Sequence, residues 1–91
     1  MDLLEDLKNR LKIMHNSEDD ELQRILKASE STIQAMTGAS DMTEPILEEL
    51  IIERSRYAYN DSLEYFEDNF QSQIMLASYM FGGLNDEKTS V

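Results

Sequence analysis

Cysteine and tryptophan are absent from the 91 residues of this chain, which also has a single proline and three glycines. Without cysteine, the sequence excludes a disulfide framework, a thiolate nucleophile and a cysteine-based zinc site. No apolar run approaches the roughly 18 residues of a membrane-spanning helix, and acidic residues follow Met1 where a signal peptide would carry basic ones. We therefore expect one small soluble domain that is not exported and does not enter a membrane.

Basic residues are also scarce, since 8 Lys and Arg stand against 19 Asp and Glu for a net charge of -11. Proteins that bind nucleic acid gain most of their free energy from Lys and Arg that displace counterions from phosphates. The one basic cluster, Lys8, Arg10 and Lys12, falls at the end of a predicted helix, where cations complement the helix dipole. The sequence therefore predicts no specific binding of nucleic acid.

Few residues offer the chemistry of catalysis or of metal binding. His15 is the only histidine and falls in a polar connection, and no GxSxG, P-loop or GxGxxG motif occurs. The segments that begin at Asn60 and Asn85 lack the ligand spacing and the central glycine of an EF-hand. The paired carboxylates are typical of solvated helix faces. We expect no enzymatic activity, no metal site and no cofactor.

Helical periodicity extends along the chain, without a strand pattern. The first predicted helix has Asp2 as its cap and an apolar stripe that runs to Met14. The second begins with Ser17 as its N-cap, has acidic residues in its first turn, and ends before Gly38. A C-terminal helix is expected to end at Gly82.

A long third helix is predicted to begin near Thr43, with Pro45 in its first turn, and to carry apolar residues as far as Phe70. Two apolar stripes on this helix need two neighbours. The first stripe comprises Leu47, Leu50, Ile51, Ala58 and Tyr65. The second stripe comprises Ile52, Tyr59, Leu63, Phe66 and Phe70. It is covered either by the C-terminal segment or by another subunit, and the many aromatic and Met side chains favour a subunit interface.

The remaining face of the predicted third helix is polar, with Glu49, Glu53, Asn60, Glu64 and Glu67. Arg54 falls on the first stripe, and Asp61 follows one heptad later. Either both side chains reach water at the edge of the stripe, or they form a partly buried ion pair within or between subunits. The overall expectation is an all-α domain over residues 1–82, a small bundle of about four helices with a long central helix. A short flexible tail over residues 83–91 follows.

Several segments resemble the head-to-tail connector proteins of tailed bacteriophages. They include DDEL at residues 19–22, KASESTI at 27–33, EPILEEL at 44–50 and ERSRYAYND at 53–61. The run EYFEDNFQS at 64–72 is similar to a branch of the same family. The similarity covers roughly residues 4–76 and consists of helix-register patterns, with no catalytic signature.

The resemblance implies a structural virion protein, made in the bacterial cytoplasm and placed at the head-tail junction. Its subunits would form a homo-oligomeric ring, a dodecamer, beneath the portal protein, extending the DNA channel and providing the docking surface for a stopper or tail completion protein. The C-terminal segment, with Leu84 and Val91, would contact the portal. The exposed carboxylates Glu49, Glu53, Glu64 and Glu67 are candidates to face the channel, where an acidic surface lets DNA slide past.

Two alternatives fit the composition. An acidic inhibitor that mimics DNA could occupy the basic groove of a nucleic-acid-binding partner, and a small helical dimer could have a regulatory role. A mimic would need closely spaced acids on one exposed face and a largely sealed core. Aromatic residues spread along one helix favour the ring instead.

Overall fold

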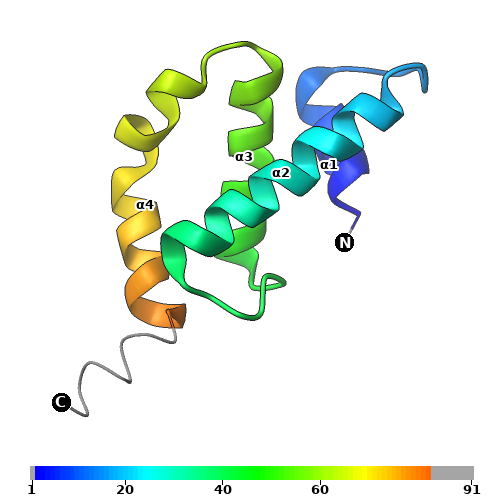
Figure 1. Cartoon of the computed structure of the whole chain (residues 1–91). Helices are drawn as coiled ribbons and strands as arrows, with labels where there is room; N and C mark the ends of the chain where they lie inside the picture. Colours follow the sequence, from blue (N-terminus) through cyan, green and yellow to red (C-terminus); the bar gives the residue numbers. More distant parts are fainter. Residues whose placement is uncertain (1, 83–91) are drawn as a thin grey trace, which may run out of the picture.

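The computed structural model describes residues 2–82, which form four α-helices and one turn of 3-10 helix. The elements are α1 (Leu3–Leu11), α2 (Asp19–Thr37), α3 (Pro45–Tyr59), η1 (Leu63–Tyr65) and α4 (Phe66–Phe81) (Figure 1). Within these residues the only β-type pairing is an isolated antiparallel bridge between Ala39 and Gly82. The expected all-α class is confirmed, whereas the tail residues Leu84 and Val91 lie outside the described residues.

The helix ends follow local sequence signals. The side chain of Asp2 accepts a hydrogen bond of 3.0 Å from the backbone N–H of Leu4, and Gly38 closes α2 at a φ of 74°. Pro45 is the first residue of α3, where its missing N–H costs nothing. The prediction of Ser17 as a cap was wrong, because its hydroxyl lies 2.7 Å from Nδ1 of His15 and α2 begins two residues later.

The core draws side chains from all four helices. Its buried members are Leu7 of α1, Leu22, Leu26 and Ile33 of α2, Ala39 of the loop, Leu47, Leu50, Ile51 and Ile52 of α3, and Phe66 and Ala77 of α4. Helices α2 and α3 each pack against both α1 and α4. As a result α1 and α4 lie on opposite sides of the molecule, with α2 and α3 between them (Figure 1).

The third helix is shorter than its periodicity predicts. Helix α3 ends at Tyr59, and Asp61 adopts a left-handed conformation with a φ of 58° that reverses the chain. The backbone N–H of Ser62 donates to the carbonyl of Tyr57 over 2.9 Å, which closes the turn. Asp tolerates this conformation better than most residues. The expected continuous helix over residues 43–70 is therefore a hairpin, in which α4 returns alongside α3 (Figure 1).

Candidate interaction surface

Three aromatic rings hold the α3–α4 hairpin together. The ring of Tyr57 forms T-shaped contacts with Phe66 and with Phe70, each at 5.7 Å between centroids, and Phe66 stacks on Phe70 at 5.0 Å. The hydroxyl of Tyr57 also accepts a hydrogen bond of 3.0 Å from the side-chain amide of Asn69. At Phe70 the backbone leaves helical geometry and α4 bends. This cluster fixes the first turns of α4 and thereby sets the direction of the rest.

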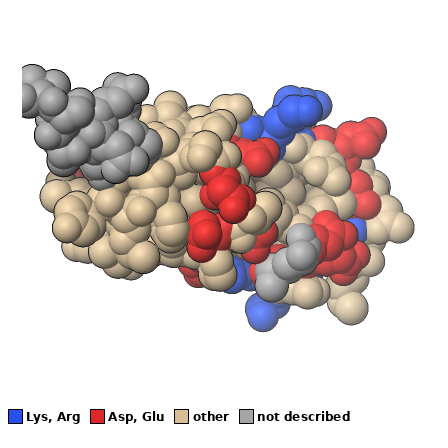
Figure 2. Space-filling model, turned by 90° about the horizontal axis from the view of Figure 1, so that it is seen from below, with Lys and Arg blue, Asp and Glu red and all other residues tan. Residues whose placement is uncertain are grey.

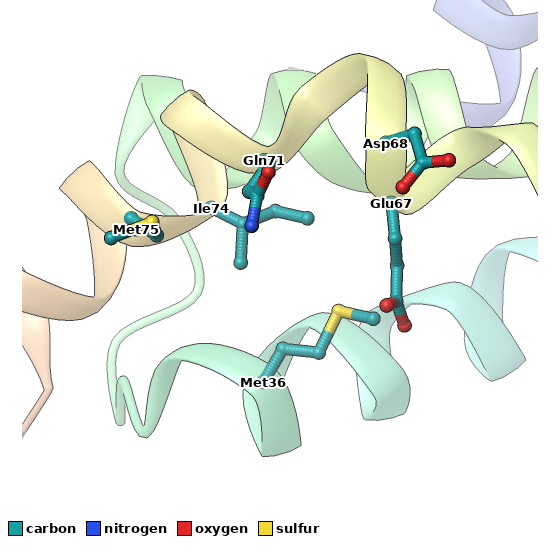
Figure 3. Close-up of a pocket in the computed structure, with 6 residues that line it drawn as sticks. All are labelled: Met36, Glu67, Asp68, Gln71, Ile74 and Met75. Atoms are coloured by element: carbon teal, nitrogen blue, oxygen red, sulfur yellow. The ribbon is translucent and has the colours of Figure 1, made fainter.

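A pocket of about 300 Å³ opens between the C-terminal half of α2 and helix α4. It is lined by Met36, Glu67, Asp68, Gln71, Ile74 and Met75. Figure 3 shows Met36 and Glu67 reaching toward one another from the two helices, with Ile74 and Gln71 beside them. The carboxylates lie at one end of the pocket and apolar side chains at the other. The polar members of the lining, Glu67, Asp68 and Gln71, are all exposed, which is typical of a protein surface.

Beyond the pocket, α4 exposes large apolar side chains to solvent. Met75, Leu76 and Met80 are 64%, 49% and 55% exposed, and we name these three residues the α4 ridge. Tyr79 beside them is 80% exposed, and no charged residue follows Asp68 in this helix. Figure 2 likewise shows uncharged side chains gathered at one end of the molecule and carboxylates across its middle and other end. A contiguous exposed patch of this kind is typical of a protein interaction site.

The structure separates the five residues predicted to form a subunit interface. Ile52 and Phe66 are each 1% exposed and belong to the core of this chain, which corrects the expectation for these two positions. The physical reason is the turn at residues 60–62, which folds the second apolar stripe back onto its own subunit. Tyr59 is half-buried and its hydroxyl donates to Glu18 over 2.9 Å. Phe70 is half-buried in the aromatic cluster, and Leu63 is 38% exposed.

The four carboxylates predicted to share an acidic face have different surroundings. Arg10 of α1 donates to Glu49 and to Glu53, each over 2.8 Å, and Arg56 donates to Glu53 over 2.7 Å. Burial alone would raise the pKa of Glu53, but the hydrogen bonds from Arg56 and Arg10 outweigh it and lower that pKa. Glu53 is thus a buried link between α1 and α3. Glu64 and Glu67 lie beyond the turn and are exposed, so the single acidic face is not formed.

Arg54 turns toward α2 and donates from Nη1 to the buried hydroxyl of Ser29 over 3.1 Å. Burial lowers the pKa of this guanidinium, while the charge of Glu67 opposes the shift. Asp61 is exposed at the turn, and among residues 2–82 no ion pair joins it to Arg54. Within the subunit the ion-pair alternative is therefore not realised, and Arg54 instead forms a hydrogen bond between helices, with a partner that helix periodicity could not reveal.

The described part of the chain holds no group of three or more His, Cys, Asp or Glu side chains placed to bind a metal ion. His15 is exposed in the α1–α2 connection, where its Nε2 lies 3.7 Å from Glu18. None of the helices within residues 2–82 is both long and apolar enough to cross a membrane. The fold and its surface thus define a small helical protein whose distinctive feature is an exposed apolar face.

The comparison with known families identifies this class more narrowly. A model of the phage gp6-like head-tail connector proteins matches residues 1–90, and the chain belongs to this family. No curated protein and no solved structure matches it. The resemblance drawn from the helix-register patterns is confirmed. The chain is a structural protein of a bacteriophage virion and belongs to the head-tail junction.

Proposed function

We propose that this protein assembles as a homo-oligomeric ring beneath the portal, extends the DNA channel, and offers the surface on which a stopper or tail completion protein docks. Family membership supports the location, and a connector has to meet the portal on one side and a tail protein on the other. The acidic inhibitor that would mimic DNA has no support in the comparisons. Its requirement for closely spaced free acids also fits poorly with a Glu53 held by two arginines.

The observation that carries the proposal is the α4 ridge. A single subunit leaves Met75, Leu76 and Met80 about half or more exposed, on a helix with no charge after Asp68. Burying apolar surface contributes roughly 25 cal/mol per Å², and contact with another subunit is the direct way to remove this face from water. Leu63, also exposed, is a second candidate for contact with a neighbour. We therefore assign the proposed subunit interface to the α4 ridge and not to the predicted second stripe.

A ring through which DNA passes needs a wall that does not bind it. The net charge of -11 meets this need over much of the surface, because a repelled duplex releases no counterions. Of the four carboxylates expected at the channel, Glu53 is buried and Glu67 lines the pocket. Glu49, Glu64 and Glu67 are exposed and therefore remain the candidates for the channel wall.

The proposal is tested with DNA-filled heads that carry the portal but lack this protein. Purified protein added to such heads should co-sediment with them, and electron microscopy should show added ring density below the portal. Retention of DNA and attachment of tails should rise in the same particles. Protein that stays in the supernatant while the heads remain intact would refute the proposed role.

The same particles test the portal contact assigned to Leu84 and Val91. We expect a chain truncated after Gly82 to keep its circular dichroism, because it retains all four described helices and the core that they form within residues 2–82. It should nevertheless co-sediment with portal-bearing heads less than the full chain does. Equal co-sedimentation of both forms would remove residues 83–91 from the portal interface.

A further inference from the structure

A second groove lies on the side of the molecule opposite α4. It measures about 610 Å³ and runs between the first turn of α1 and the middle of α2. Leu3, Leu4 and Leu26 give it an apolar lining, and Arg24 and Lys27 also line it. Gln23, Asp2 and Glu30 complete the lining, and the carboxylate of Asp2 is engaged in capping α1. We name this feature the α1–α2 groove.

Lys27 is a cation without a partner among the described residues 2–82. Lys8, Arg10, Arg24 and Arg56 form ion pairs within the subunit, and Arg54 donates to Ser29. Within residues 2–82, the side chains of Lys12 and Lys27 alone among Lys and Arg form neither an ion pair nor a hydrogen bond. Two copies of a chain with a net charge of -11 repel one another. A contact between copies is therefore most favourable where an unpaired cation meets an unpaired acid.

Asp68 is such an acid, and it adjoins the α4 ridge. It lines the same pocket as Met75, is exposed, and forms no ion pair among the described residues. Figure 3 shows its carboxylate pointing away from Met36 and from the interior of the pocket. The α4 ridge thus lies beside the unpaired anion Asp68, and the α1–α2 groove holds the unpaired cation Lys27 together with Glu30.

We propose that the α4 ridge of one subunit seats in the α1–α2 groove of a second copy, with Asp68 beside Lys27 of that copy. This assignment rests on the proposed ring and names the two faces that build it. The contact joins two different surfaces, one on α4 and one on α1 and α2, and α1 and α4 lie on opposite sides of the molecule (Figure 1). A head-to-tail contact of this kind closes into a ring when the rotation between subunits allows it, whereas a contact of like faces stops at a dimer.

Reversal of charge tests the pairing on portal-bearing heads. Lys27→Glu should lower the apparent affinity between subunits about tenfold, and adding Asp68→Lys to it should restore assembly. Lys12→Glu is the matched control, because it makes the same change of charge at an unpaired lysine of residues 2–82 that does not line the groove. If the wild type forms rings and Lys27→Glu behaves as Lys12→Glu does, the pairing is wrong while the ring stands. If the wild type forms no ring, the proposed function fails as well.

Disulfide trapping gives an independent measurement, and the absence of native cysteine removes any background. In assembled rings, Lys27→Cys combined with Asp68→Cys should yield a ladder of cross-linked oligomers after oxidation. The control pairs Asp68→Cys with Asn9→Cys, an exposed position of α1 outside the groove, and should give no ladder. Rings without a ladder, or with cross-linked dimers alone, would overturn the head-to-tail contact between these faces.

Discussion

Glu49 and Glu53 both accept hydrogen bonds from Arg10 but differ in burial. This difference allows a test of how much each ion pair contributes to the packing of α1 on α3. Both carboxylates accept a hydrogen bond of 2.8 Å from Arg10, yet their side chains are 53% and 10% exposed. Hydrogen bonds to charged groups inside a protein contribute about 1.5–3 kcal/mol, whereas exposed ion pairs contribute roughly 0–1 kcal/mol. We therefore expect Glu53→Gln to destabilise the fold by ~1.5–3 kcal/mol and Glu49→Gln by less than ~1 kcal/mol.

Thermal unfolding followed by circular dichroism measures this difference. In a domain of this size each kcal/mol lowers Tm by about 4–8 °C, so Glu53→Gln should lose roughly 6–24 °C and Glu49→Gln less than about 8 °C. Chemical denaturation of both variants at one pH provides a second estimate of the same free energies. Equal losses at the two positions would show that burial does not decide the strength of this network.

The pH dependence of the Glu53 effect follows from the direction of its pKa. Because the folded state lowers this pKa, the stabilisation is present above the unfolded value of about 4.3 and disappears as pH falls through the folded value. The gap between wild type and Glu53→Gln should thus be full at neutral pH and close in acid. A gap that persists at the lowest pH at which the protein is folded would contradict the charged state of Glu53.

Three further predictions concern the end of α4, the core and DNA. A Cβ on Gly82 would lie 2.5 Å from the carbonyl oxygen of Ser78 and 2.6 Å from that of Thr37. Gly82→Ala should therefore lower the free energy of unfolding, measured by urea denaturation, by ~1–3 kcal/mol. An unchanged free energy would mean that the end of α4 does not pack against Thr37. Phe66→Ala should lower the free energy of unfolding by ~3–5 kcal/mol, and the same change at the exposed Leu63 should lower it far less. The reverse order would mean that Phe66 belongs to a subunit interface and not to the core. In gel-shift titrations at moderate salt the protein should not retain duplex DNA. Tight, salt-sensitive binding would contradict the proposal that DNA passes a channel wall that does not bind it.

The signals at helix ends were sufficient to predict most of the fold. Asp2, Gly38, Pro45 and Gly82 each stand where the sequence placed them, because their effects on the backbone are local. The length of the third helix was not predictable from periodicity, since the apolar residues after the turn continue in register with those before it. The signal that could have shown the break was the Asn60 to Ser62 segment, whose short polar side chains favour turns.

The site was less predictable than the fold. A stripe of apolar residues shows which side chains are buried. Whether they pack within their own chain or against a second copy depends on where the chain reverses. The hydrogen bond between Arg54 and Ser29 and the ion pairs of Arg10 join residues far apart in sequence, so no local pattern contains them. The exposed end of α4 carries aromatic and Met side chains, the kind from which the sequence predicted a subunit interface, but only the burial of Phe66 and Ile52 distinguishes it from the predicted stripe.

The contacts that join the helices differ in how far apart their residues lie in the sequence, and this difference predicts the order in which the helices fold. The aromatic cluster of the α3–α4 hairpin closes a short loop, whereas the hydrogen bond from Arg10 to Glu53 spans 43 residues. Short loops close at a smaller entropic cost, so we expect the hairpin to form early and α1 to dock last. The α1–α2 groove is then completed only in the final step. In the proposed ring, a partly folded chain would present the ridge but no groove, so it could bind one neighbour but could not accept the next.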